Sequence, residues 1–148
     1  MNETERLLAI EEIKALKARY FLGVDTQDWD LLRSEVFVEE TSFDLPEDRP
    51  EPYRGADTVL ELFAAVLTGK QSVHHGHMPI IELTSEATAT GMWAMEDRIY
   101  LRDAGPADNT LWLHGFGHYH ETYVKRDAGW RILAIRLVRL RVETRTII

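Results

Sequence analysis

The stretch RYFLGVDTQDWD, residues 19–30, closes the first amphipathic segment of the chain. Upstream of it, apolar residues recur at three- and four-residue steps, at Ile10, Ile13, Leu16, Tyr20 and Val24. Charged residues, Lys17 among them, fill much of the remaining surface. This spacing predicts one helix over residues 3–24 with a single buried side, capped by Asn2 or Thr4 and loosened at its end by Gly23.

Asp25 lies about one turn beyond Tyr20 at the end of this predicted helix. The apolar stripe should hold its carboxylate over the interior of the protein, where an ionised group is costly unless it has a partner or a function. Alternatively, Asp25 caps a short helix that begins near Trp29, although Asp28 is better placed for that role. Asp25 is therefore a candidate catalytic residue.

Composition limits the class of protein. A chain of 148 residues with 45% hydrophobic content predicts a single domain over residues 1–148. The formal net charge of -8 would repel phosphate backbones and anionic lipid, so neither nucleic acid nor membrane is an expected partner. The chain has no cysteine, which rules out a thiolate nucleophile. Its first residues lack the pattern of a signal peptide and no apolar run could span a bilayer, which predicts a cytoplasmic protein.

The second half of the sequence has the pattern of a β-sheet. A short helix near 29–34, a strand at 35–44, a proline-rich loop at 45–52 and a helix between Gly55 and Gly69 come first. Four strand candidates follow, at 72–83, 87–101, 110–126 and 130–145, separated by short turns that include residues 103–109. This order predicts an α+β fold, with the helices packed in a strongly curved mixed or antiparallel sheet that encloses a pocket.

Several motifs, in their order and spacing, resemble the SnoaL-like branch of the NTF2-like superfamily, the cystatin-like α+β cone. They are residues 20–30, Gly55-Ala56-Asp57, Ser72-Val73-His74-His75, residues 87–91, Gly117-His118-Tyr119 and residues 123–132. The resemblance covers nearly the whole chain and implies a cone with a helix-lined pocket. Because the superfamily holds dehydratases, isomerases, cyclases, oxygenase accessory subunits and non-catalytic binders, the fold by itself does not give the function.

Within that superfamily the pattern is similar to that of scytalone dehydratase. There an aspartate at the end of the first helix and a histidine that opens the third strand flank the substrate, and these match Asp25 and His74. Other pocket positions of that enzyme are occupied differently here, by Ile99, Gly117, Tyr119 and Asp44. The resemblance thus implies catalysis by Asp25 and His74, while the departures argue against the same reaction on the same substrate.

The chemistry of this pair can also be argued from the side chains themselves. Desolvation in an apolar cavity raises the pKa of a carboxylate, which makes Asp25 a usable base or acid, and His74 would make the complementary proton transfer. Elimination of water or migration of a double bond also needs a hydrogen-bond donor for the developing oxyanion. The candidate donors and substrate-binding residues are Tyr20, Asp44, Trp93, Met95, Asp97 and Tyr119.

Asp97 allows two interpretations. Alternation along a strand places it on the same face as Met95 and Ile99, near Asp25, where two carboxylates would split their pKa values. In the structural alternative it pairs with a neighbouring arginine, the candidates being Arg98, Arg139 and Arg141.

The six histidines fall in two clusters, at 74–77 and 114–120. His75 and His77 share a strand face, and with Glu82 they superficially resemble the first cupin metal motif. The chain begins with a long helix and shows no second cupin motif, so no metal ligand is predicted. If Tyr119 faces inward, alternation turns His118 and His120 outward, where they would belong to a contact between subunits. A homodimer or higher oligomer is therefore expected.

The sequence thus predicts a small-molecule lyase or isomerase that uses Asp/His acid–base catalysis. Its substrate would be a hydrophobic, oxygenated molecule of polyketide, aromatic or terpenoid type. No phosphate-binding glycine loop, nucleotide fingerprint or nucleophile elbow is present, so no cofactor is expected. Two alternatives stay open: a non-catalytic ligand carrier or oxygenase accessory subunit of the same fold, and a histidine-rich metal-binding protein. An accessory subunit would have its cavity filled by side chains.

Overall fold

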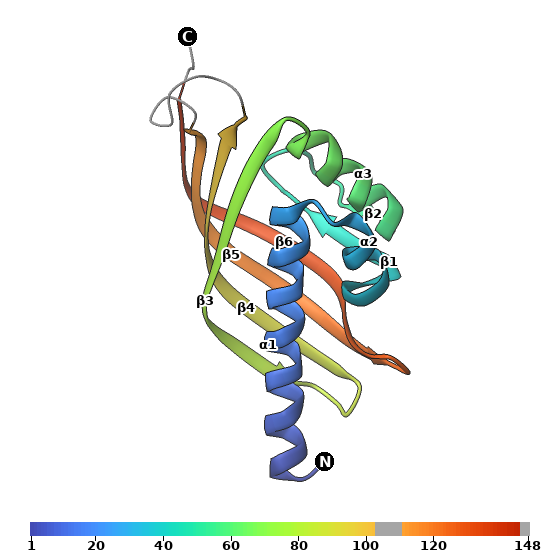
Figure 1. The fold of residues 1–148 in the computed structure, drawn as a ribbon. Helices are drawn as coiled ribbons and strands as arrows, with labels where there is room; N and C mark the ends of the chain where they lie inside the picture. The colour runs from blue at the N-terminus through green and yellow to red at the C-terminus, as the bar shows by residue number, and fades with distance from the viewer. Residues whose placement is uncertain (103–110, 146–148) are drawn as a thin grey trace.

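The computed structural model describes residues 1–102 and 111–145, in which helices precede a mixed sheet (Figure 1). The helical segments are α1 (Glu3–Thr26), α2 (Trp29–Leu31), the π-helical turn η1 (Leu32–Val36) and α3 (Ala56–Leu67). The strands are β1 (Phe37–Asp44), β2 (Tyr53–Arg54), β3 (Lys70–Leu83), β4 (Thr88–Leu101), β5 (Leu111–Arg126) and β6 (Gly129–Thr144). The predicted α+β class is confirmed, with a sheet that is curved but not closed.

Strand order in the described sheet is β2-β1-β6-β5-β4-β3. β3 to β6 form the predicted antiparallel meander. β1 joins parallel to β6, which makes the sheet mixed, and β2 pairs antiparallel with β1. The predicted turn at 103–109 and the first residue of the strand predicted at 110–126 lie outside the described residues. None of the helices in the described ranges combines the length and apolar character that crossing a bilayer requires.

α1 begins where the sequence indicates and ends later than predicted. Asn2 forms a capping box with Glu5, whose side chain accepts a hydrogen bond from the Asn2 N–H. The helix ends at Thr26 and is capped by Gln27, whose N–H donates to the Gly23 and Val24 carbonyls and whose left-handed φ of 55° stops the helical path. Asp25 therefore belongs to the last turn of α1. Asp28 caps α2 by accepting from the Leu31 N–H, so Asp25 is free of that role.

The helices lie on one side of the curved sheet, and the core fills the space between (Figure 1). α1 contributes an apolar stripe that includes Ile13, Leu16, Tyr20 and Val24, all buried. Ile10, predicted to be part of the stripe, is only half-buried, and Ala9 takes its place in the core.

Lys17 corrects the sequence interpretation, because its side chain is fully buried rather than on the polar surface of α1. The reason is its spacing, four residues after Ile13 and three before Tyr20, which puts it on the buried stripe. Its ammonium pairs with Glu121 and lies 3.6 Å from the centroid of the Tyr119 ring. Burial lowers the pKa of Lys17 to about 8, against the opposing charge of Glu121.

Glu121 extends this pair into a chain of buried polar groups. It accepts a hydrogen bond of 2.5 Å from the Tyr123 hydroxyl, which in turn accepts one of 2.9 Å from the Trp93 indole. Each member therefore has a partner, which is the condition for keeping such groups in a core.

We expect Glu121→Gln to lower the free energy of unfolding by about 3–5 kcal/mol, because it leaves the Lys17 ammonium buried without a counter-charge. Combining it with Lys17→Met should recover most of that loss, since the Gln oxygen can still accept from Tyr123. Urea denaturation measures both. The matched control is Lys14→Met, which removes an exposed pair with Glu11 and should change stability by less than about 1 kcal/mol. Equal losses in the single and double variants would contradict a coupled pair.

Buried tyrosines should make the protein lose stability at high pH. Burial raises the pKa of Tyr20, Tyr119 and Tyr123 well above the usual value. Above pH of about 10 the unfolded chain loses these protons while the folded protein keeps them, so the free energy of unfolding falls by about 1.4 kcal/mol per pH unit for each tyrosine. Urea denaturation at several pH values between 10 and 11.5 gives the free energy of unfolding as a function of pH. In Tyr123→Phe this free energy should fall by about 1.4 kcal/mol less per pH unit than in the wild type, and identical slopes in the two proteins would refute the assignment.

Candidate active site

The carboxylate of Asp25 joins the end of α1 to the start of β3. It accepts hydrogen bonds from the Ser72 hydroxyl (2.8 Å), the His74 backbone N–H (2.8 Å) and His74 Nδ1 (2.6 Å). Ser72 and His74 are two residues apart on β3, so they share one face of the strand and both reach the helix. With this set of donors, Asp25 is an ionised acceptor that holds His74 in place.

His74 is the member of this pair that faces a cavity. Donation from Nδ1 to Asp25 fixes the tautomer in which Nε2 carries the lone pair of the neutral ring. Nε2 lies 3.9 Å from an oxygen of Asp97, and the ring stacks on Phe21 with their planes 17° apart. The cavity lining includes His74 but not Asp25, so the structure places Asp25 behind the imidazole rather than in the open space.

Asp97 and Arg139 form a second fixed pair beside His74. The guanidinium donates two parallel hydrogen bonds to the carboxylate, of 2.8 and 2.9 Å, and both side chains are largely buried. Arg139 is thus the partner among the three arginines that the sequence offered. Gly115 on β5 makes room for the pair, because a Cβ there would lie 2.0 Å from Arg139 Nη1 and 2.3 Å from Asp97 Oδ1.

The cavity itself lies between the helices and the sheet and has a volume of about 290 Å³. One end is polar, lined by His74, Asp97, Arg139, Tyr20 and Tyr119. The walls are mainly apolar and come from α1, α3, β1, β4, β6 and the loop after β1, with residues Val24, Phe43, Leu45, Leu62, Phe63, Val66, Leu67, Ile99 and Leu137. Two more polar residues also line the cavity, Asp48 in that loop and Tyr53 on β2, whose hydroxyl donates to the Asp48 carboxylate (2.5 Å). A small apolar molecule would fit there with one polar end against His74.

Of the predicted substrate-binding residues, Tyr20, Asp97 and Tyr119 line this cavity. Trp93 and Met95 are buried on the same face of β4 but do not line it, and the Trp93 indole is engaged with Tyr123.

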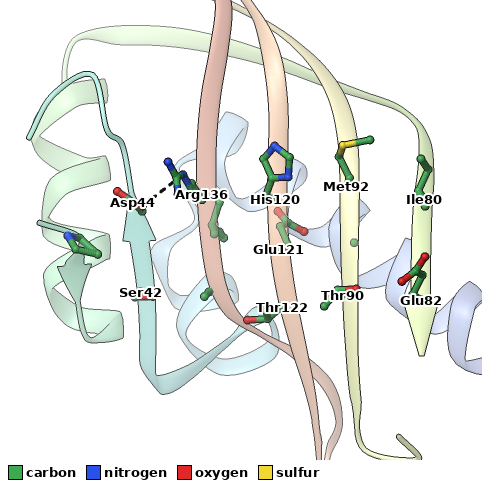
Figure 2. A pocket seen from close by; sticks show the side chains of 14 residues that line it. Ser42, Asp44, Ile80, Glu82, Thr90, Met92, His120, Glu121, Thr122 and Arg136 are labelled. Atoms are coloured by element: carbon green, nitrogen blue, oxygen red, sulfur yellow. Dashed lines mark ion pairs between the residues drawn. The ribbon is translucent and has the colours of Figure 1, made fainter. Parts of the chain in front are cut away.

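Asp44 lies on the opposite face of the sheet, where it lines a separate hollow (Figure 2). Alternation along β1 explains this placement, since Phe43 faces the cavity and its neighbour must face away. The Asp44 carboxylate lies 3.7 Å from the Arg136 guanidinium in that hollow.

The remaining histidines lie apart from His74. His75 and His77 are exposed on the other face of β3, with ring centroids 6.4 Å apart. Tyr119 is buried, and His120, next along β5, is exposed. In the part of the chain that the structure describes, no three His, Cys, Asp or Glu side chains come together as a metal site would need.

Several site residues were not predicted, among them Ser72, Gly115, the cavity position of Arg139, and the polar lining residues Asp48 and Tyr53. Ser72 had a usable signal, because it stands two residues before His74 on a predicted strand. Arg139 lies two residues after Leu137 and faces the cavity with it, whereas counting from Trp130 and Ile132 gives the opposite face, because an irregularity in the pairing of β5 with β6, between Thr122 and Tyr123, shifts the register by one residue. Counting by twos along the sequence does not find such a shift.

Comparison with known proteins places this geometry in a family. The model of the SnoaL-like domain matches residues 5–136. A hexachlorocyclohexane dehydrochlorinase (LinA, type 2) has a similar structure, with a TM-score of 0.81 and 18% identity, over 99% of this chain and 95% of that one. A candidate scytalone dehydratase from Novosphingobium aromaticivorans DSM 12444 has a TM-score of 0.83 and 18% identity, over 99% of this chain and 94% of that one. A protein of unknown function from Mycobacterium tuberculosis has a TM-score of 0.77 and 28% identity, over 93% of this chain and 75% of that one. The resemblance indicated by the motifs is confirmed.

We expect Gly115→Ala to lower the free energy of unfolding by about 1–3 kcal/mol, because the new methyl group must displace the Asp97–Arg139 pair. The same change in an Asp97→Ala, Arg139→Ala background should cost less than about 0.5 kcal/mol, since the clashing atoms are gone. Urea denaturation of the four proteins gives the coupling directly. An equal cost in both backgrounds would show that Gly115 is required for another reason.

Proposed function

We propose that this chain, which belongs to the SnoaL-like family, is a lyase or isomerase in which His74 removes a proton from carbon in a small neutral substrate. The observation that carries the proposal is the 2.6 Å hydrogen bond between Asp25 and His74 Nδ1, beside a cavity that His74 lines. An imidazole held in this way, by a carboxylate that also accepts from the Ser72 hydroxyl and the His74 backbone N–H, is a general base of fixed orientation.

Proton transfer assigns complementary roles to the two residues. Nε2 of neutral His74 takes the proton from carbon, and the electron pair of the broken C–H bond forms a carbon–carbon double bond or an enolate. The negative charge of Asp25 stabilises the imidazolium that results. In an elimination, a hydroxyl leaves with the imidazolium proton as water, or a halide leaves as the anion. In an isomerisation, His74 returns the proton to another carbon.

Tyr20 and Tyr119 supply hydrogen bonds at the same end of the cavity. Burial raises the pKa of both hydroxyls, so both remain protonated donors at neutral pH. Such donors stabilise a developing oxyanion or a departing group. Asp97 adds no net charge, because its carboxylate is neutralised by Arg139. A neutral group therefore suits this end of the cavity better than an ionised one, and the Asp48 carboxylate elsewhere in the lining disfavours an anionic substrate.

The size and lining of the cavity support a compact, mostly hydrophobic substrate. A volume of about 290 Å³ stands at the small end of ligand sites, which fits a molecule built around one ring. The names of two structurally similar proteins, a dehydrochlorinase and a candidate dehydratase, both denote eliminations and support the lyase interpretation. The open cavity also argues against an accessory subunit, whose interior would be filled by side chains.

The test is a panel of neutral single-ring compounds that carry a hydroxyl or halide next to an acidic C–H, followed by the ultraviolet absorbance of the new double bond. With a substrate in hand, His74→Ala should lower kcat/KM by about 100-fold or more, because the base is gone. Asp25→Asn should lower kcat mainly, since it removes the charge that stabilises the imidazolium. Circular dichroism should show that both variants remain folded.

His75→Ala is the matched control, because its side chain is exposed on the opposite face of the same strand and its loss should leave the rate unchanged. Full activity in His74→Ala would refute the proposed base. If the wild-type protein binds compounds of the panel but converts none of them, the result would instead favour a ligand carrier.

A further inference from the structure

The ammonium of Lys17 lies against the faces of two tyrosine rings that also line the cavity. Its Nζ is 3.6 Å from the ring centroid of Tyr119 and 3.9 Å from that of Tyr20. A cation in this position is attracted by the electron density of the aromatic face and polarises it. The cavity lining includes both tyrosines but neither Lys17 nor Glu121, so a bound molecule would touch the rings and not the ion pair behind them.

The Lys17–Glu121 pair has a direction relative to the cavity. Tyr119 precedes Glu121 by two residues on β5, and both side chains are buried on the face of the sheet that the helices cover (Figure 1). The polar end of the cavity lies beyond Tyr119 in the opposite direction along β5, where Gly115 pairs with Asp97 in the strand register. The positive end of the ion pair is therefore the end nearer to the cavity.

Stability is a weak reason for keeping this pair in the core. Both side chains are fully enclosed, so both lose their hydration, and apolar residues of similar volume often stabilise a core as well or better. Burial lowers the pKa of Lys17 to about 8, which still leaves its ammonium charged at neutral pH. The protein thus keeps a full positive charge directly behind two rings of its cavity lining.

We propose that Lys17, oriented by Glu121, is a positioning residue whose charge strengthens the Tyr20 and Tyr119 hydroxyls as hydrogen-bond donors toward the cavity. An ammonium over the ring face draws electron density away from the phenol oxygen, which makes the O–H group more positive. Because the ammonium is fixed in the core before any reaction, it needs no rearrangement when negative charge develops. This role rests on the proposed function, in which such charge develops as His74 removes a proton from carbon.

The arrangement favours the transition state over a neutral ground state. A neutral substrate gains little from an ion pair that it does not touch. Negative charge that builds up beside the tyrosine hydroxyls lies closer to Lys17 than to Glu121, so the attraction exceeds the repulsion. An interaction that strengthens only in the transition state raises kcat and leaves KM unchanged.

Two probes of nearly the same shape test the charge effect without any turnover. One is 3,4-dinitrophenol, which is ionised at neutral pH, and the other is 3,4-dinitrotoluene, its neutral analogue. In Lys17→Met combined with Glu121→Gln, the affinity for the phenolate should fall about threefold or more, because the nearer positive charge is lost. The affinity for the neutral analogue should stay the same. Isothermal titration calorimetry gives both dissociation constants.

The matched control is Lys14→Met, which removes an exposed charge from the same helix and should change neither affinity. A purely structural role for the ion pair predicts that the double variant binds both probes more weakly by the same factor. That result, or two unchanged affinities, would overturn the proposal whether or not His74 is the base, because binding of the probes needs no base. A wild-type protein that binds neither probe would also overturn it, since the tyrosines would then face no open cavity.

Circular dichroism shows whether the double variant is folded. If methionine prevents folding, Lys17→Gln with Glu121→Gln replaces it, as a neutral pair whose two amides can keep a hydrogen bond. With a substrate in hand, the neutral pair should lower kcat about threefold or more and leave KM unchanged. A rise in KM with an unchanged kcat would contradict a role confined to the transition state.

Discussion

The hydrogen bonds accepted by Asp25 are the interaction from which the rest of the site follows. They fix the end of α1 against the beginning of β3, and they use one carboxylate to satisfy a hydroxyl, a backbone N–H and an imidazole. For this to work α1 must continue past Gly23 for one more turn, which the left-handed cap at Gln27 allows. The cavity, the orientation of His74 and the proposed chemistry all depend on that last turn.

Two buried ion pairs lie in the interior, one in the core under α1 and one at the cavity. Lys17 and Glu121 lie under α1, fully enclosed, in contact with the aromatic rings of Tyr20 and Tyr119. Asp97 and Arg139 lie at the cavity, where the geometry is bidentate and a glycine makes room for it. In both places a charge is retained in a low-dielectric interior because its partner is fixed by the sheet. The same rings that cover the first pair line the cavity beside the second.

Much of the fold could be predicted from sequence, because the strand alternation and the helix spacing are regular. The four long strands, the first helix and the pairing of Asp25 with His74 follow from local pattern and from the resemblance. The predictions that failed relied on residue type or on the resemblance instead of spacing, or met an irregularity in the strand register. The charge of Lys17 predicts a surface position, although its spacing puts it on the buried stripe of α1. The resemblance predicts Asp44 in the pocket, although strand alternation turns it away from the cavity that its neighbour Phe43 faces. Arg139 faces the cavity together with Leu137, and only an irregularity in the pairing of β5 with β6, between Thr122 and Tyr123, separates both from the count that starts at Ile132.

The parallel pairing of β1 with β6 joins segments about ninety residues apart in the sequence, and it has a kinetic consequence. Loop closure over such a distance is entropically costly, so this contact forms late and raises the contact order of the fold. During synthesis β1 leaves the ribosome long before the strand it pairs with. Until β6 is made, the apolar side of α1 has no complete sheet to cover it, and the nascent chain depends on avoiding premature association.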